Sequence, residues 1–172
     1  MIFKDAYGTV FEKPESIEMI DRFSIYSLIF IKDINKFVFI IPDYAKGTHF
    51  YKCAGGGIEE GEDLLYALNR ELIEEINYPL NQHFKLEHNM SYDFLFKPIG
   101  KPNAYWNNKQ TFFYYTVDQS EQTNYPEKNW ISTLEGTDVV YLDPSFVFNN
   151  LNCFHSTIVD FLKEIQQLFF NQ

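Results

Sequence analysis

Three glutamates with helical spacing are the residues whose types and positions best fit a chemical role. Glu71, Glu74 and Glu75 occupy positions i, i+3 and i+4, so a helix would hold their carboxylates on one side, within roughly 6 Å of each other. Carboxylates this close repel each other unless a positive charge lies among them. Mg²⁺ and Mn²⁺ prefer oxygen ligands and carry that charge. The spacing therefore predicts a site for divalent metal ions.

An arginine and a run of glycines accompany these glutamates. Arg70 can hold a carboxylate through two parallel hydrogen bonds, and Glu62, eight positions upstream, is the candidate partner. The glycines at 55–57 are predicted to form a turn, because glycine adopts backbone angles that other residues avoid and lets a ligand approach the main chain. A Glu62–Arg70 pair would hold this turn against the helix. The ordinary alternative is a solvated acidic helix face beside a simple turn.

A helix over residues 62–76 is needed to present these groups. Its apolar residues fall at i, i+3, i+7 and i+11, the stripe typical of a helix packed on a core: Leu65, Leu68, Leu72 and Ile76. We expect the acidic side chains to lie on a different face from this stripe. Asn77 is predicted to end the helix in a left-handed conformation, and Pro79 prevents its continuation.

A β-hairpin is predicted upstream of this segment. Residues 23–32 and 37–44 are rich in β-branched and aromatic residues, and they are apolar enough for a sheet that is buried on both faces. Pro42 is expected to end the second strand or to place it at a sheet edge. Residues 1–22 can form a short hairpin around Gly8.

Strands and loops fill most of the remaining chain. We predict strands at 48–54, 83–88, 91–99, 111–118, 130–134 and 139–143, and polar loops at 100–109 and 119–129. A final helix with apolar spacing over 158–169 would be capped by Ser156 or Thr157. Two main helices around a mixed sheet indicate an α/β protein of the α+β type.

Composition and charge limit the class of protein. The chain has 172 residues, of which 45% are hydrophobic, and these fit a single domain over 1–172. The formal charge of −10 argues against a nucleic-acid polymer as partner. Charged residues near the N-terminus argue against a signal peptide, and the longest apolar stretch, nine residues at 23–31, is too short for a membrane span. We expect a cytoplasmic protein with reduced Cys53 and Cys153, although the sequence leaves a disulfide between them open.

The segment from Gly56 to Tyr78 resembles the Nudix box, whose pattern is Gly, five residues, Glu, seven residues, then Arg-Glu-aliphatic-x-Glu-Glu-x-Gly-aliphatic. The matching residues are Gly56, Glu62, Arg70, Glu71, Leu72, Glu74 and Glu75. Asn77 replaces the last glycine and Tyr78 replaces an aliphatic residue. Asparagine tolerates the left-handed conformation, so we expect the helix to end in the same way. Cys-Ala at 53–54 stands where many relatives have Leu-Pro, which removes no ligand.

The resemblance implies a helix–sheet–helix sandwich with a mixed β-sheet. It also implies a hydrolase that cleaves a diphosphate linkage in a nucleotide or in a small molecule linked to a nucleoside diphosphate. Bound metals would neutralise the diphosphate and lower the pKa of an attacking water. The resemblance assigns metal binding to Glu71, Glu74, Glu75 and the carbonyl of Gly55, and the orientation of loop and helix to Glu62 and Arg70.

The resemblance leaves the general base open. Glu74 or Glu75 could take the proton of the attacking water, and so could a residue of a later loop. Glu121 and Glu127 are the loop candidates, although each is more often an ordinary surface charge.

Residues outside the box are candidates for binding the substrate. Tyr105 and Trp106 could stack on a nucleobase, which stabilises by roughly 1–3 kcal/mol per base, and Asn152 could bind a purine edge. The alternative is packing in an aromatic-rich core, which is the favoured role of Phe50 and Tyr51. For Asn152 the alternative is a turn or cap.

Other functions remain open at this level. The chain could be a non-catalytic nucleotide-binding or sensor module on the same scaffold, or a protein-interaction domain with a solvated acidic helix. The box does not select among nucleoside triphosphates, ADP-ribose, dinucleoside polyphosphates and nucleotide sugars, and a monomer and a homodimer are both compatible with the sequence.

Overall fold

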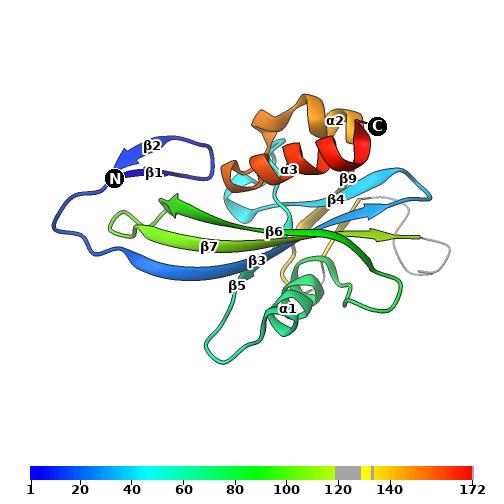
Figure 1. Ribbon diagram of the computed structural model, residues 1–172, viewed down its shortest axis with the longest axis horizontal. Helices are drawn as coiled ribbons and strands as arrows, with labels where there is room; N and C mark the ends of the chain where they lie inside the picture. The colour runs from blue at the N-terminus through cyan, green and yellow to red at the C-terminus, as the bar shows by residue number, and fades with distance from the viewer. Residues whose placement is uncertain (119–128, 133, 172) are drawn as a thin grey trace.

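The long strand β3 (Ile20–Ile31) lies at the centre of a mixed sheet in the computed structural model, which describes residues 1–118, 129–132 and 134–171 (Figure 1). It pairs in parallel with β7 (Trp106–Val117), and antiparallel with both β4 (Lys36–Ile41) and β5 (Ala54–Gly57). The other strands are β1 (Ile2–Lys4), β2 (Val10–Glu12), β6 (Lys85–Phe96), β8 (Trp130–Ile131) and β9 (Asp138–Leu142). The strand order across the sheet is β2-β1-β6-β7-β3-β4-β9-β8, and β5 lies off this path beside β3.

Helices cover both faces of this sheet. The helix α1 (Leu64–Ile76) lies on one face, while α2 (Pro144–Asn149) and α3 (Val159–Ile165) lie on the other (Figure 1). Side chains alternate along β3, so Ile25 and Ile29 pack in the cluster under α1, whereas Leu28 packs in the cluster under α3. The predicted mixed sheet, buried on both faces between helices, is confirmed.

Several predicted strands need new limits. The hairpin of β3 and β4 and the short hairpin of β1 and β2 around Gly8 are confirmed. The two strands predicted at 83–88 and 91–99 are replaced by the single strand β6, which starts two residues later, ends three residues earlier and has an irregularity between Leu86 and His88. The polar loop at 100–109 is shorter than predicted, because β7 already begins at Trp106.

The glycine segment is a strand and not a turn. Gly55, Gly56 and Gly57 pair with Tyr26, Ile25 and Ser24 of β3. Gly55 has φ 136°, and a Cβ built on it would lie 2.1 Å from the carbonyl oxygen of Ile25. Glycine is therefore required here because two strands approach closely at a backbone angle that other residues avoid.

The helix α1 begins two residues later than predicted. Asp63 caps it by accepting a hydrogen bond from the Tyr66 N–H at 2.8 Å. Asn77 ends it with φ 63°, as predicted. The predicted apolar stripe is wrong at Leu65, which is 55% exposed, and Ala67 is buried instead. Leu65 is the second residue of α1, in its first turn.

The C-terminal part contains one helix more than predicted. The helix α2 follows Asp143 and has Pro144 in its first turn, a position that suits proline because its missing N–H is not needed there. The last helical segment starts with a 3₁₀ turn at Ser156–Ile158, and the side chain of His155 accepts from the Thr157 N–H. Neither Ser156 nor Thr157 is the cap that the sequence suggested.

Two further predictions concern the whole chain. Within the described residues, no helix is both long and apolar enough to cross a membrane. Cys53 is buried, Cys153 is partly buried, and both are free thiols.

Candidate active site

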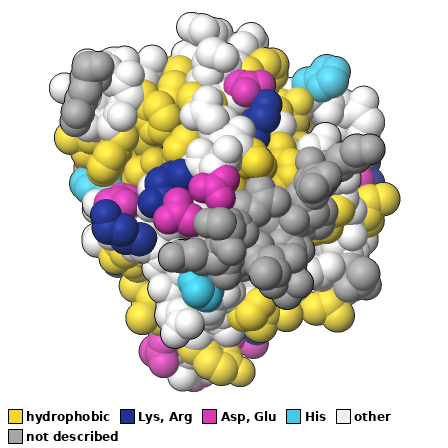
Figure 2. Space-filling model, turned by 90° about the vertical axis from the view of Figure 1, so that its right-hand side faces the viewer, with side chains coloured by type: hydrophobic (Ala, Val, Ile, Leu, Met, Phe, Trp, Pro, Cys, Tyr) yellow, Lys and Arg dark blue, Asp and Glu magenta, His cyan; other side chains and the backbone are white. Residues whose placement is uncertain are grey.

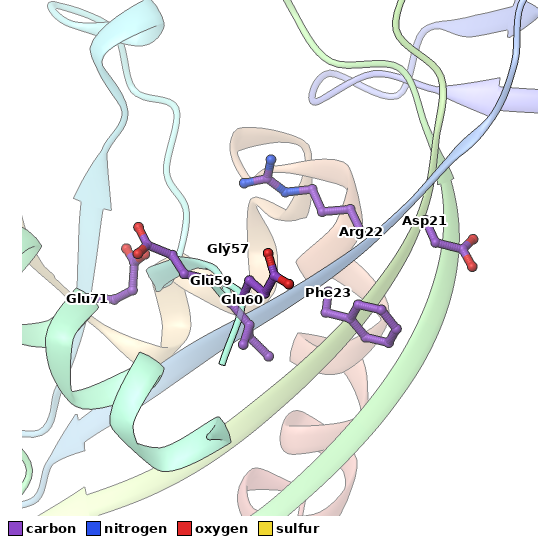
Figure 3. A pocket seen from close by; sticks show the side chains of 8 residues that line it. Asp21, Arg22, Phe23, Gly57, Glu59, Glu60 and Glu71 are labelled. Carbon is purple, nitrogen blue, oxygen red and sulfur yellow. The ribbon is translucent and has the colours of Figure 1, made fainter. Parts of the chain in front are cut away.

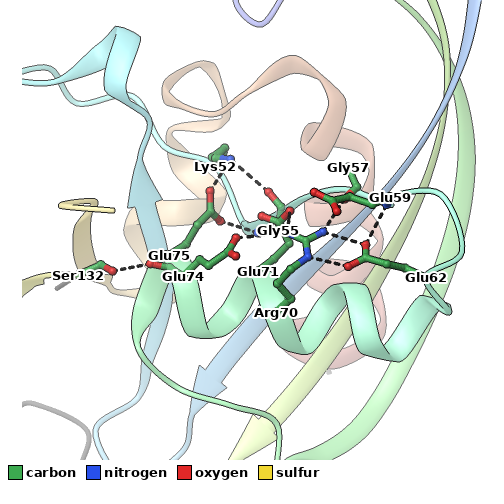
Figure 4. A network of polar contacts seen from close by, with 10 residues as sticks. All are labelled: Lys52, Gly55, Gly57, Glu59, Glu62, Arg70, Glu71, Glu74, Glu75 and Ser132. Carbon is green, nitrogen blue, oxygen red and sulfur yellow. Dashed lines mark hydrogen bonds and ion pairs between the residues drawn. The ribbon is translucent and has the colours of Figure 1, made fainter. Parts of the chain in front are cut away.

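Arg70 is the centre of a polar network on α1 (Figure 4). Its Nε and Nη2 donate to the two carboxylate oxygens of Glu62 at 2.7 and 2.9 Å, which is the predicted bidentate pair. Nη1 donates to Glu71 at 2.8 Å and to Glu74 at 3.2 Å. Nη2 also donates to the Gly57 carbonyl at 3.0 Å. One guanidinium thus connects three carboxylates of the box to the glycine strand.

Glu62 is held in its charged form by these contacts. The hydrogen bonds from Arg70, followed by one from the Glu59 N–H at 2.8 Å, lower the pKa of Glu62 to about 2. Glu62 therefore fixes the loop after β5 to the helix, as predicted from the spacing.

Glu71 lies against the main chain of Gly56. A Cβ built on Gly56 would approach both carboxylate oxygens of Glu71 to 2.6 Å, so any larger residue at 56 would displace this carboxylate. Burial raises the pKa of Glu71 above its ordinary value, and the neighbouring Arg70 offsets part of that rise. Glycine at 56 and glutamate at 71 are therefore fitted to each other.

Glu75 differs from the other two glutamates because it is only 7% exposed. Its Oε2 accepts from the Gly55 N–H at 2.6 Å, and its Oε1 accepts from the Lys52 ammonium at 2.9 Å. Burial raises the pKa of Glu75, and Lys52 opposes that rise. The expectation that all the acidic side chains lie away from the core is thus wrong for Glu75.

Lys52 is a residue of this site that the sequence did not predict. Its ammonium also donates to the Gly55 carbonyl at 3.2 Å. Burial favours its neutral form, but the charge of Glu75 raises its pKa above the ordinary value. A single lysine within the otherwise apolar stretch 49–54 is the signal that could have revealed it, because a buried lysine needs a carboxylate partner.

The donor set fits a hard divalent cation in type, since Glu71, Glu74, Glu75 and the Gly55 carbonyl offer only oxygen ligands. In position, the carboxylates are directed to the cations of the chain, Arg70 and Lys52. Within 1–118, 129–132 and 134–171, no three acidic, histidine or cysteine side chains converge into a ligand set. Glu71 and Glu74 would have to exchange Arg70 for the ion by a change of side-chain conformation.

A pocket of about 720 Å³ opens beside this network (Figure 3). Glu71 is the box carboxylate that reaches it, and residues 57–60 form its rim. The opposite wall comes from the start of β3, at Asp21, Arg22 and Phe23. The pocket is therefore large enough for a small-molecule ligand and has acidic and basic groups in its walls.

The two aromatic candidates have different environments. Trp106 is half-buried at the start of β7, and its ring centroid lies 4.5 Å from the Arg22 guanidinium carbon. Tyr105 is only 6% exposed and packs edge-on against Phe3 at 5.0 Å, which puts it in the core and leaves no open ring face for a base. Phe50 is buried as well, as its alternative role predicted.

The remaining candidates are Asn152 and two glutamates of the loop at 119–129. Asn152 is exposed in the 3₁₀ turn Leu151–Cys153, and the neighbouring Asn150 donates its side-chain amide to the Phe146 carbonyl, as a cap would. Glu121 and Glu127 lie outside the described residues.

Comparisons with known proteins agree with this geometry. The family model described as "NUDIX domain" matches residues 27–142. No curated protein sequence matches the chain significantly.

Solved structures with low sequence identity share the fold. A dihydroneopterin triphosphate pyrophosphohydrolase from E. coli is 17% identical, with a TM-score of 0.58 over 90% of this chain and 100% of that chain. A MutT protein from a study of Aliivibrio salmonicida and Vibrio cholerae is 17% identical, with a TM-score of 0.55 over 86% and 98%.

A bifunctional NMN adenylyltransferase/ADP ribose pyrophosphatase from Francisella tularensis, complexed with AMP and a Mn ion, is 14% identical. Its TM-score is 0.63, over 90% of this chain and 43% of that chain. At these identities the likeness concerns the fold alone. The match of the family model over most of the chain, together with the box residues gathered around Arg70, shows that the chain belongs to the Nudix family.

Proposed function

We propose that this protein is a divalent-metal-dependent hydrolase that cleaves a diphosphate linkage in a nucleotide or in a small molecule linked to a nucleoside diphosphate. The observation that carries the proposal is the complete set of box carboxylates beside the 720 Å³ pocket, three of them held by Arg70 and the fourth, Glu75, by Lys52. A module that only bound nucleotides would not need all of these carboxylates.

We assign different roles to the residues that would hold the metal ion and to those that position the loop and α1. When bound, Mg²⁺ or Mn²⁺ would supply positive charge to the diphosphate and lower the pKa of an attacking water. Glu71, Glu74, Glu75 and the Gly55 carbonyl are the groups that would hold the ion. Arg70 and Glu62 keep the loop and α1 in register, so that these oxygens stay next to the pocket.

Access to water distinguishes two candidates for the general base. The Glu74 side chain is 36% exposed, whereas that of Glu75 is 9% exposed and paired with Lys52. A base must reach a water molecule by hydrogen bonding, so Glu74 is the stronger of the two candidates.

The candidate substrates come from the chemistry of the box and from the names of similar structures. The E. coli neighbour acts on dihydroneopterin triphosphate and the F. tularensis neighbour on ADP-ribose. We therefore propose nucleoside triphosphates, dihydroneopterin triphosphate, ADP-ribose, dinucleoside polyphosphates and nucleotide sugars as the compounds to test.

The test is a hydrolysis assay of this panel with Mg²⁺, Mn²⁺ or EDTA, scored by separating the products. We expect metal-dependent turnover of at least one compound and a loss of at least 100-fold in Glu74→Gln and in Glu75→Gln. Asp160→Asn is the control, since it changes an exposed carboxylate on α3. Metal-dependent binding without turnover would instead support the sensor module, and full activity in both glutamine variants would refute their assigned roles.

We also infer that the whole chain forms one domain. The N-terminal hairpin joins the main sheet, because Lys4 of β1 pairs with Phe96 of β6. A monomer and a homodimer both fit this arrangement.

A further inference from the structure

Arg22 is a basic residue in the wall of the pocket that the Nudix box does not include. It lies on β3 and extends towards Gly57 (Figure 3). A Cβ built on Gly57 would lie 2.7 Å from Nη2 of Arg22. The absence of a side chain at 57 therefore lets the guanidinium rest on the glycine strand.

Among the described residues, no carboxylate pairs with the charge of Arg22. In the part of the chain that the structure describes, its interaction is with the ring of Trp106 at 4.5 Å. The adjacent Asp21 is engaged elsewhere, because it accepts from the Asn107 amide at 2.8 Å and lies 3.8 Å from the Lys109 ammonium. Stacking on an indole occupies the face of a guanidinium and leaves its N–H edge available.

Several other basic residues near the surface have a carboxylate partner. Lys32 pairs with Asp118 at 3.0 Å and Lys36 pairs with Asp143 at 2.7 Å. Figure 2 shows the same tendency, with basic groups lying next to acidic ones on one face of the molecule. In a chain with a formal charge of −10, a half-buried arginine without a carboxylate partner needs another explanation.

A second cation lies at the same ring. The Lys101 ammonium is 5.3 Å from the Trp106 centroid, so two positive charges lie near one indole, and one of them, Arg22, lines the pocket that also contains Glu71. A ligand with anionic oxygens would satisfy the unpaired donors here. Phosphate oxygens match the planar fork of a guanidinium and accept two parallel hydrogen bonds from it.

We propose that Arg22, held in place by Trp106 and Gly57, binds a phosphate group of the substrate. The identity of that substrate rests on the proposed function, but the affinity of this subsite for a diphosphate does not require turnover. Arg22 is thus a substrate-binding residue on the wall opposite the box carboxylates, and a phosphate held there would be placed next to Glu71.

The test uses the fluorescence of Trp106 in the full chain. Trp106 and Trp130 are the two tryptophans, so a Trp130→Phe background isolates the indole that touches Arg22. Sodium pyrophosphate is titrated in this background, once with Mg²⁺ and once with EDTA. We expect a saturable change in fluorescence, and Arg22→Met should raise the dissociation constant at least tenfold in the Mg²⁺ series.

Two variants make the test specific. Lys109→Met, which removes a nearby cation that contacts Asp21 and the ring of Phe23, should leave pyrophosphate binding within twofold. Arg22→Lys keeps the positive charge but loses the two parallel N–H donors of the guanidinium, so it should weaken binding to an intermediate extent. If Arg22→Met fails to fold, Arg22→Lys still tests the proposal. Unchanged affinity in the Arg22 variants would overturn the proposal.

A kinetic measurement separates this proposal from the function on which it rests. With a compound that is turned over, Arg22→Met should raise KM about tenfold and change kcat by less than about threefold. Turnover with an unchanged KM in Arg22→Met would refute the role of Arg22 alone. Arg22-dependent binding of pyrophosphate, without hydrolysis of any compound in the panel, would refute the hydrolase and support the subsite.

Discussion

Arg70 and Arg22 approach the same residue, Gly57, and have opposite surroundings. Arg70 donates to the Gly57 carbonyl and to the carboxylates of Glu62, Glu71 and Glu74. Arg22 lies where a Gly57 side chain would be, and its guanidinium stacks on the ring of Trp106 without a carboxylate partner among the described residues. Arginine therefore serves two purposes beside β5: Arg70 holds the scaffold together on one side, and Arg22 has N–H groups available for a ligand on the other.

The difference shows how the acidic residues of the chain are used. Carboxylates gather on the α1 side because that helix carries three of them within five residues. On the β3 side, the carboxylate next to Arg22 in the sequence, Asp21, is turned to Asn107 and Lys109. Both cations are arginines, so what distinguishes them is the position of nearby carboxylates: Arg70 has carboxylate partners and holds the structure together, whereas Arg22 does not.

The largest effect is expected when the committed arginine is removed. Arg70→Met leaves three carboxylates without their cation and should lower the free energy of unfolding by about 3 kcal/mol. Arg22→Met loses a single cation–π contact and should lower it by less than about 1 kcal/mol. Urea unfolding in EDTA measures both variants. Equal losses would show that the two arginines do not differ as described.

A smaller effect involves His155, which is half-buried and lies near Trp106 through Phe96. Its ring lies 5.4 Å from that of Phe96, which in turn packs against Trp106. The Thr157 N–H donates to its Nδ1 at 3.3 Å, which fits a neutral imidazole. Burial, together with the charge of Lys52, lowers the pKa of His155 to about 3.

The sign of the pH effect follows from this lowered pKa. Below about pH 6.5 the imidazole takes up a proton in the unfolded chain but not in the folded chain. The free energy of unfolding therefore decreases as the pH is lowered from about 6.5 to about 3. His155 should therefore cost about 2 kcal/mol between pH 7 and pH 5. Chemical unfolding at both pH values should show this loss in the parent and in His49→Gln, an exposed control, and a smaller loss in His155→Gln. An equal loss in His155→Gln would contradict the assignment.

The smallest effect measures the contact that holds the unpaired arginine. A double-mutant cycle with Arg22→Met and Trp106→Leu should give a coupling free energy of about 0.5–1 kcal/mol in favour of the pair. The same cycle with Lys109→Met in place of Arg22→Met serves as the control. If the first cycle gave no coupling free energy, the stacking on Trp106 could not be what holds Arg22 in place.

The parts of the site that could be predicted from the sequence are those that a single helix determines. The Glu62–Arg70 pair and the left-handed Asn77 depend on spacing within one continuous segment. Lys52 comes from the segment before β5 that bridges to Ile40, and Arg22 comes from β3, so their contacts depend on pairing across the sheet. A one-dimensional pattern contains little of that information.

The wrong predictions have the same origin. Leu65 fits the apolar spacing, but it lies in the first turn of α1 and is 55% exposed, because spacing along a helix does not say how far the core extends beneath it. Tyr105 was assigned to a polar loop, yet Phe3 from the distant N-terminal hairpin covers its ring. Glu75 matched the acidic face, but Lys52 compensates its charge and allows it to be buried.

The pairing of β3 with β7 has a consequence for the order in which the protein can fold. The two strands are parallel along their whole length, from Ile20 with Trp106 to Ile31 with Val117, and the glycine strand and α1 both lie in the chain between them. Closing so long a connection is entropically costly, and sheets built from distant segments form slowly. During synthesis, β3 cannot pair with β7 until residues 106–117 have been made. The Glu62–Arg70 ion pair, in contrast, can form as soon as its own short segment folds. The Arg22 side of the pocket is then completed last, once Trp106 has arrived.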